Sequence, residues 1–205
     1  MDDLNEFLDF YNKNKNRIKK FLESFEKNNE EKQILGELVF CLCTPQSKAK
    51  YCREFVESIK TDNTLFSLSL EDLRKRMNRI RFSDRKAEFI IDARKKFPEI
   101  KEKIISGYPD LREWLIKNVK GIGMKESAHF LRNLGFRGVP IIDIHVQNFL
   151  RKLGLYDNHK GGLTKKRYLE LEKKFLDLAK KLNIPPDELD IAIWLFESEE
   201  KEFYG

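Results

Sequence analysis

The chain has 205 residues, of which 40% are hydrophobic and 36% are charged, so it can form a packed core and is not an intrinsically disordered protein. No segment approaches the ~20 apolar residues of a membrane-spanning helix, and the first residues lack the pattern of a secretion signal, so we expect a cytoplasmic protein without a membrane partner. The net charge of +6 favours a polyanionic partner, although a surface rich in ion pairs would also account for many lysines.

Apolar residues recur at helical spacing along the chain, which predicts an all-α fold. Two amphipathic helices are expected first, one on residues 4–11 and one on residues 18–25. After the polar residues 26–29, the segment 34–42 is apolar over a broad face and predicts a central buried helix. This helix should stop at Thr44-Pro45, because proline removes a backbone donor and disfavours helix in the preceding residue.

Three cysteines, Cys41, Cys43 and Cys52, lie close together in this region. They are too few for the four thiolates of an iron–sulfur cluster, and the last third of the chain contains none. An odd number of cysteines also gives no disulfide framework. We expect all three to be buried apolar residues of two neighbouring helices rather than metal ligands.

The next helices are predicted by periodicity and one strong cap. Ser69 and Asp72 form a capping box at the start of a helix that should close near residues 79–83. Phe82 then falls in a loop between helices, among several arginines. An exposed aromatic side chain in such a loop could stack on a nucleic-acid base beside phosphate contacts. The alternative is a side chain of a small satellite core.

Residues 111–134 carry two helical segments joined by Lys120-Gly121-Ile122-Gly123. The glycines permit a tight turn, and the free amides at the start of the second helix suit a phosphate oxygen. Gly121 and Gly123 are therefore candidate contacts to a DNA backbone. A helix pair that merely turns on glycine is the alternative.

Lys125 lies in the first turn of the second helix, and Asp143 follows after a loop at residues 135–140. Because a helix of ten residues is only ~15 Å long, the chain can return and bring Asp143 beside Lys125. The apolar spacing after Asp143 also makes it the natural N-cap of a further helix. Taken singly, a cap and a solvated lysine would explain the two residues.

Two helices should complete the chain. A long amphipathic helix is expected over residues 163–182, using Leu169, Phe175, Leu176 and Ala179 as its apolar face. After the break at residues 183–185, Pro186 suits the first turn of a last helix, which carries Trp194.

The run GIGMKESAHFLRNLG followed by PIIDIHV resembles the hairpin, catalytic lysine and catalytic aspartate of the bifunctional branch of the helix-hairpin-helix DNA glycosylase superfamily. With LCTPQSKA near residue 45 and no added domain, the chain looks most like the archaeal-type, second family of 8-oxoguanine DNA glycosylases. The resemblance implies excision of 8-oxoguanine from double-stranded DNA and strand cleavage by the lyase reaction. We expect two packed helical subdomains with a cleft between them, at residues 31–140 and at residues 1–30 plus 141–205.

The resemblance also implies residue roles. Lys125 would attack C1′ of the flipped nucleotide and form a Schiff base, while Asp143 would stabilise the charge on the sugar. Gln46 matches the residue that fills the gap left by the extruded base, or else is a polar loop residue. Trp194 is expected to sandwich the base with Phe82, or else to belong to the core.

Further contacts are expected around these residues. His145 would donate to a phosphate, as the matching histidine does in related glycosylases, and Lys48 is a phosphate candidate by charge and place alone. His129 follows Lys125 by one turn on the same helix face and could form part of the pocket wall. The tail at residues 202–205 departs from the lysine ending expected of the family, so its role in base recognition is left open.

We expect a monomer that needs no catalytic metal or other cofactor, with room for a structural monovalent cation at the hairpin carbonyls. A glycosylase for another oxidised base is one alternative function. A non-catalytic helix-hairpin-helix DNA-binding protein is another, and a structural helical bundle without a nucleic-acid partner is the third.

Overall fold

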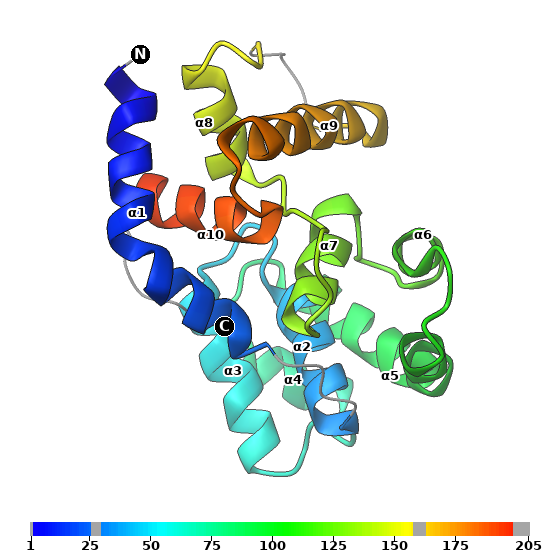
Figure 1. Ribbon diagram of the computed structural model, residues 1–205. Helices are drawn as coiled ribbons and strands as arrows, with labels where there is room; N and C mark the ends of the chain where they lie inside the picture. The colour runs from blue at the N-terminus through cyan, green and yellow to red at the C-terminus, as the bar shows by residue number, and fades with distance from the viewer. Residues whose placement is uncertain (1, 26–29, 158–162, 199–205) are drawn as a thin grey trace. The chain divides into compact units, whose positions relative to one another are not determined.

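The computed structural model describes residues 2–25, 30–157 and 163–198, and every regular element within these ranges is an α-helix (Figure 1). The predicted all-α fold is confirmed. None of the helices in these ranges is both long enough and apolar enough to cross a membrane. The described residues form two compact units: a terminal unit of residues 2–25 and 135–198, and a hairpin unit of residues 30–134.

The hairpin unit is built around one buried helix. Its helices are α2 (Glu31–Cys43), α3 (Ala49–Thr61), α4 (Leu70–Arg76), α5 (Ser83–Ile105), α6 (Leu111–Asn118) and α7 (Met124–Asn133) (Figure 1). α2 packs against α3, α5 and α7, and all its residues from Ile34 to Cys43 are buried. The predicted central helix is therefore confirmed, and it ends directly before Thr44-Pro45.

The three cysteines lie in this buried region as free thiols. Burial raises the pKa of all three, and that of Cys52 reaches about 11. At neutral pH they are therefore uncharged and pack as small apolar side chains, as predicted.

The terminal unit is also organised around one buried helix. It contains α1 (Asp2–Glu23), α8 (Ile144–Lys152), α9 (Lys165–Leu182) and α10 (Pro186–Glu197). α10 packs against α1, α8 and α9, and its residues from Asp187 to Ile193 are buried without interruption. Pro186 occupies the first turn of α10, where its missing N–H would have no intrahelical partner in any case.

The expectation of two separate N-terminal helices was wrong, because α1 is continuous from Asp2 to Glu23. Tyr11 and Ile18 are two helical turns apart, so the two apolar groups lie on one stripe, and both side chains are buried. The polar residues between them include neither glycine nor proline. Nothing local therefore breaks the helix.

The predicted apolar face of α9 was also partly wrong. Leu169 and Leu176 are 43% and 37% exposed, whereas the buried face is centred on Tyr168, Leu171 and Phe175. The two leucines lie one residue off this stripe, a rotation of about 100° around the helix.

The predicted cap at Ser69 is confirmed, since its hydroxyl accepts from the Asp72 amide at 3.1 Å.

Candidate functional site

The predicted hairpin forms between α6 and α7, which pack against each other. Gly121 has φ +85°, and a Cβ there would lie 2.4 Å from Cδ2 of Phe89, so a side chain is excluded by both conformation and space. Gly123 instead has φ −105° as the N-cap of α7, and a Cβ there would lie 3.1 Å from the Glu126 carboxylate. Of the two glycines, Gly121 is the one that the backbone geometry requires.

The start of α7 offers free amides. Its first-turn N–H groups lack intrahelical partners by helix geometry, and Gly123 provides no side chain to cap them. Ser127 is the first residue of α7 whose amide bonds back to the hairpin, donating to the Gly123 carbonyl at 2.9 Å. Such an amide cluster suits an anionic oxygen, and its contact with a DNA phosphate stays a prediction.

Lys125 lies in this first turn and is partly buried. Its Nζ is 3.4 Å from Oε1 of Glu126, a long ion pair that leaves the amine in reach of solvent, since 31% of the side chain is exposed. Ala128, Phe130 and Leu131 of the same helix are buried. The helix is thus anchored by its apolar face while the lysine extends from its edge.

His129 lies one turn after Lys125, with its ring edge-on to Phe40 at a centroid distance of 5.4 Å. Burial lowers the pKa of His129 well below its ordinary value, and the positive charges of Arg132 and Lys125 add to this effect. The ring is therefore neutral at pH 7 and offers one hydrogen-bond donor and one acceptor. A neutral, polar wall is compatible with the predicted pocket role.

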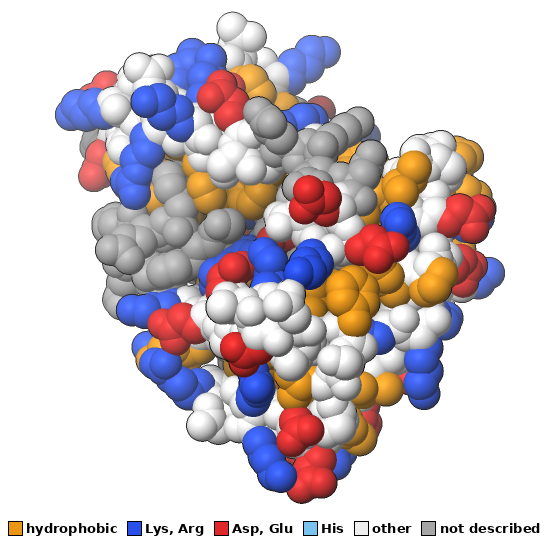
Figure 2. Space-filling model, turned by 90° about the horizontal axis from the view of Figure 1, so that it is seen from below, with side chains coloured by type: hydrophobic (Ala, Val, Ile, Leu, Met, Phe, Trp, Pro, Cys, Tyr) orange, Lys and Arg blue, Asp and Glu red, His pale blue; other side chains and the backbone are white. Residues whose placement is uncertain are grey.

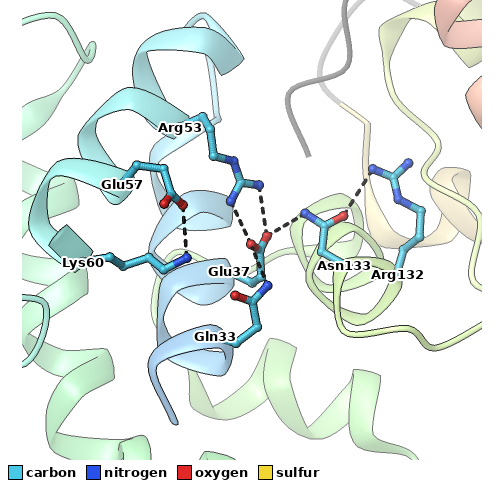
Figure 3. A network of polar contacts seen from close by, with 7 residues as sticks. All are labelled: Gln33, Glu37, Arg53, Glu57, Lys60, Arg132 and Asn133. Atoms are coloured by element: carbon cyan, nitrogen blue, oxygen red, sulfur yellow. Dashed lines mark hydrogen bonds and ion pairs between the residues drawn. The ribbon is translucent and has the colours of Figure 1, made fainter. Parts of the chain in front are cut away.

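A buried polar network holds α7 to its neighbours (Figure 3). Glu37 on α2 is 2% exposed and pairs with both terminal nitrogens of Arg53 on α3, at 2.7 and 3.1 Å. Asn133, at the end of α7, donates to the same carboxylate at 2.8 Å. The Arg53 guanidinium also stacks over the Phe40 ring, 3.9 Å from its centroid. The contacts thus join α2, α3 and α7 close to His129, which lies against Phe40 and one helical turn before Asn133.

Sequence reasoning missed this network. The available signal was Glu37, a charged residue in the middle of the broad apolar face of α2. A buried charge needs a partner, because removing it from water is costly. That argument predicts a cation nearby without saying which of the 40 lysines and arginines supplies it.

The loop after α2 carries two candidate DNA contacts. Gln46 is exposed and has φ +55°, and Lys48 is exposed as the N-cap of α3. Phe82, the N-cap of α5, is 58% exposed and has φ +58°. Such exposure does not fit a satellite core residue, whereas it is what base stacking requires.

The remaining candidates lie in the terminal unit. Asp143 is the N-cap of α8, and its Oδ1 accepts from the Val146 amide at 2.9 Å, which confirms the predicted cap. His145 is half-buried in the first turn of that helix. Trp194 is half-buried on α10, between the buried residues Ile193 and Leu195.

The segment before Asp143 is held through its backbone. The amide of Gly138 donates to Asp187 at 2.9 Å and that of Ile141 to Asp190 at 3.3 Å, both on α10. The amide of Ile142 donates to the hydroxyl of Tyr168 on α9 at 3.0 Å. Residues 138–142 thus reach Asp143 along a fixed path.

Seven of the predicted site residues belong to the hairpin unit and three to the terminal unit. The hairpin unit has Gln46, Lys48, Phe82, Gly121, Gly123, Lys125 and His129, and the terminal unit has Asp143, His145 and Trp194. The approach of Asp143 to Lys125, the pairing of Phe82 with Trp194 and the cleft stay predictions. Within the described ranges, no group of three or more His, Cys, Asp or Glu side chains is placed to hold a metal ion.

Acidic partners offset part of the basic surface. Arg76 pairs with Asp62 at 2.6 Å, and beside the hairpin Lys120 lies 2.7 Å from Asp92. The hydrogen bond from Lys120 lowers the pKa of Asp92, and the same bond raises that of Lys120. On the face shown in Figure 2, basic and acidic side chains are interspersed. Ion pairing therefore accounts for some of the lysine and arginine content. This was the alternative explanation that the sequence offered for the many lysines.

Comparison with known proteins places this arrangement in a family. The family model described as 8-oxoguanine DNA glycosylase matches residues 14–184. A Korarchaeum cryptofilum protein named 8-oxoguanine DNA glycosylase/AP lyase is 38% identical over 88% of this chain and 88% of its own length. A Fusobacterium nucleatum protein of the same name is 36% identical over 90% of this chain and 88% of its own.

Solved structures agree. The Methanocaldococcus jannaschii 8-oxoguanine glycosylase/lyase, in complex with 15mer DNA containing 8-oxoguanine, superposes with a TM-score of 0.88 at 29% identity, covering 99% of this chain and 100% of that one. The 8-oxoguanine DNA glycosylase of Thermotoga maritima gives a TM-score of 0.86 at 29% identity, covering 98% and 99%. The helix-hairpin-helix unit, the lysine at the start of its second helix and these matches together show that the chain belongs to the 8-oxoguanine DNA glycosylase family.

Proposed function

We propose that this protein is a bifunctional DNA glycosylase and AP lyase that excises 8-oxoguanine from double-stranded DNA and nicks the strand. The observation that carries the proposal is the position of Lys125, a partly exposed amine in the first turn of α7, directly after a hairpin whose amides suit a phosphate. The relatives named 8-oxoguanine DNA glycosylase/AP lyase, and the relative solved with 8-oxoguanine DNA, support this substrate.

DNA binding would begin at the hairpin. The amides that follow Gly121 bind a backbone phosphate, with Lys48 and His145 as further phosphate contacts. Extruding the damaged nucleotide costs a few kcal/mol in lost stacking and pairing. Gln46 would offset part of this cost by filling the vacated stack, while Phe82 and Trp194 stack on the extruded base and His129 lines its pocket.

Lys125 is proposed as the nucleophile. Only a neutral amine, with its free electron pair, can attack C1′. The amine nitrogen forms a bond to C1′ as the bond from C1′ to the base nitrogen breaks. The base leaves with that electron pair and takes up a proton, while the attacking amine gives one up. The bond from C1′ to O4′ then breaks, O4′ keeps its electron pair and takes up a proton, and the nitrogen lone pair forms the C1′=N bond of a protonated Schiff base.

Strand cleavage follows from the same intermediate. The Schiff base acidifies the C2′ proton, whose removal forms the C2′–C3′ double bond and breaks the C3′–O bond, so the 3′ phosphate leaves with its electrons. Water then hydrolyses the Schiff base and restores Lys125. These steps rest on an amine and a carboxylate, and we therefore propose that no cofactor takes part in them.

Asp143 would stabilise the oxocarbenium-like charge on the sugar during base release. One of its oxygens is already engaged, because Oδ1 accepts from the Val146 amide. This bond fixes the carboxylate as the helix cap and leaves Oδ2 for the sugar. We propose that the enzyme acts as a cytoplasmic monomer on prokaryotic DNA, with a structural cation at the hairpin as a further hypothesis.

Borohydride trapping tests the function directly. A duplex with one 8-oxoguanine should give a covalent adduct with the protein, whereas an undamaged duplex should not. Lys125→Gln should abolish both the adduct and the nick while keeping duplex binding, since the hairpin is unchanged. An adduct formed only with an oxidised pyrimidine would keep the mechanism and replace the substrate. No adduct with any lesion would favour a non-catalytic DNA-binding protein.

A further inference from the structure

Lys86, near the start of α5, is a buried cation that none of the roles above uses. Its side chain is 4% exposed, and its Nζ donates to the carbonyls of Cys43 and Pro45, each at 2.7 Å, and to the Ser47 hydroxyl at 3.0 Å. An ammonium has three N–H donors, and here each has an oxygen acceptor. The charged form is thus stabilised by hydrogen bonds even though burial lowers the pKa of Lys86.

The acceptors belong to the chain that leaves the central helix. Cys43 is the last residue of α2, where carbonyls lack intrahelical partners and the helix dipole favours a cation. Pro45 and Ser47 lie on either side of Gln46. The single ammonium therefore holds the loop of residues 44–48 on both sides of Gln46.

A second loop is fixed at the same point. The Ser47 hydroxyl, which accepts from Lys86, also accepts from the Arg81 amide at 3.0 Å. Arg81 directly precedes Phe82. Lys86 and Ser47 thus join the loop that carries Gln46 to the loop that carries Phe82.

Both candidates have a backbone conformation that needs such support. Gln46 and Phe82 have φ angles of +55° and +58°, in the left-handed region that side chains with a Cβ rarely occupy. Both are exposed, so burial of their own side chains does not hold them there. Conformations of this kind persist when the surrounding structure fixes them, and they gather at functional sites.

We propose that Lys86 is a positioning residue for nucleotide extrusion: its ammonium, acting through the 44–48 loop and Ser47, holds Gln46 and Phe82 in the conformations in which one fills the vacated stack and the other stacks on the extruded base. The inference rests on the proposed glycosylase function and adds a residue that contacts neither DNA nor Lys125. The loops are organised before DNA binds, so extrusion does not have to order them.

Lys86→Met tests the proposal, because methionine keeps an unbranched chain of similar length and removes the three donors. Arg94→Met is a matched control on the same helix. Arg94 is also a partly buried cation, with a pKa lowered to about 10 by burial, and it donates to the Leu68 carbonyl at 2.6 Å, in another loop. Each variant removes a cation that is at least partly buried. Of the two cations, only Lys86 holds the loops that carry Gln46 and Phe82.

Two substrates and one signal separate positioning from general damage. For Lys86→Met we expect single-turnover excision of 8-oxoguanine to fall about tenfold or more, with much less loss of cleavage at a preformed abasic site, which has no base to extrude or stack. The fluorescence rise of a 2-aminopurine placed beside the lesion, which reports unstacking, should be lost. Arg94→Met should keep both the fluorescence rise and the ratio of the two rates.

Ser47→Ala is the second variant if Lys86→Met does not fold. It removes the shared acceptor between the loops and keeps the Lys86 bonds to both carbonyls, so a smaller defect of the same kind is expected. The proposal is overturned if Lys86→Met, or Ser47→Ala in its place, extrudes the base like wild type, or if both substrates slow equally. It is also overturned if Arg94→Met shows the same selective defect. If the wild-type protein forms no borohydride adduct with any lesion duplex, the proposed function itself fails and this inference fails with it.

Discussion

The two groups proposed to react, Lys125 and Asp143, are held in place by different kinds of contact. Around the helix of Lys125, charged side chains buried within the hairpin unit bond to one another, as in the Glu37–Arg53 pair and its contact with Asn133. Ahead of Asp143, backbone amides of the terminal unit donate to side-chain oxygens, and the aspartate caps its own helix. The lysine side chain is left able to move and react, whereas the carboxylate is fixed by one of its own oxygens.

This difference predicts different costs of disruption. A broken side-chain pair in the hairpin unit leaves a buried charge without a partner, which is strongly destabilising. A lost acceptor in the terminal unit leaves one neutral amide unsatisfied, which costs less. Substitutions in the hairpin unit and in the terminal unit can therefore be ranked by the loss of stability that each should cause.

The largest effect is expected on catalysis, from Asp143→Asn. Asparagine keeps an oxygen that can accept from the Val146 amide and is as good an N-cap as aspartate, so stability should change little. The loss of charge beside the sugar should slow base release about 10²–10⁴-fold. Single-turnover excision together with thermal unfolding measures both. If excision falls only as far as the folded fraction does, Asp143 is a cap and nothing more.

The next effect is expected on stability, from Arg53→Met. It leaves the Glu37 carboxylate, which is almost fully buried, without its cation and should cost about 3–5 kcal/mol in the free energy of unfolding. The control is Arg79→Met, which breaks the exposed pair between Arg79 and Glu54 and should cost less than about 1 kcal/mol. Urea unfolding of the three proteins gives the comparison, and equal losses for the two variants would contradict it.

A smaller effect is expected from Tyr168→Phe in the terminal unit. The change removes the hydroxyl that accepts from the Ile142 amide, next to Asp143, and should cost about 1–3 kcal/mol because the buried amide loses its acceptor. Tyr108→Phe serves as the control, since Tyr108 is exposed. A loss at Tyr168 as large as that at Arg53 would remove the distinction between the two kinds of support.

The same distinction explains how much could be predicted from sequence. Most of the helices, the glycine hairpin, the Ser69 cap and the Asp143 cap depend on residues close together in the sequence, so local pattern was enough. Asn133 and Glu37 lie 96 positions apart, and Lys86 bonds to carbonyls about 40 positions earlier. No local rule selects such partners. A lysine four residues before the buried Ile90 was the available hint, because it places a charge on the core stripe of α5.

The smallest effect expected is a pH dependence that arises among the charges around Lys125. Burial and neighbouring cations lower the pKa of His129 well below its ordinary value, so the unfolded chain binds a proton there that the folded chain does not. This contribution to stability is present above about pH 6.5 and is lost as the pH falls below it, amounting to less than about 1 kcal/mol at pH 6.

His129→Gln has no ring that titrates. It should therefore lose the part of the fall in stability at low pH that His129 causes, and keep the part that other groups cause. Urea unfolding of both proteins between about pH 7.5 and pH 5.5 measures the difference, in a window above the ordinary range of the carboxylates. Parallel stability curves would show that His129 takes up its proton equally well in the folded protein. The ring would then be open to solvent and able to carry a charge to a phosphate, and the neutral pocket wall beside Lys125 would be ruled out.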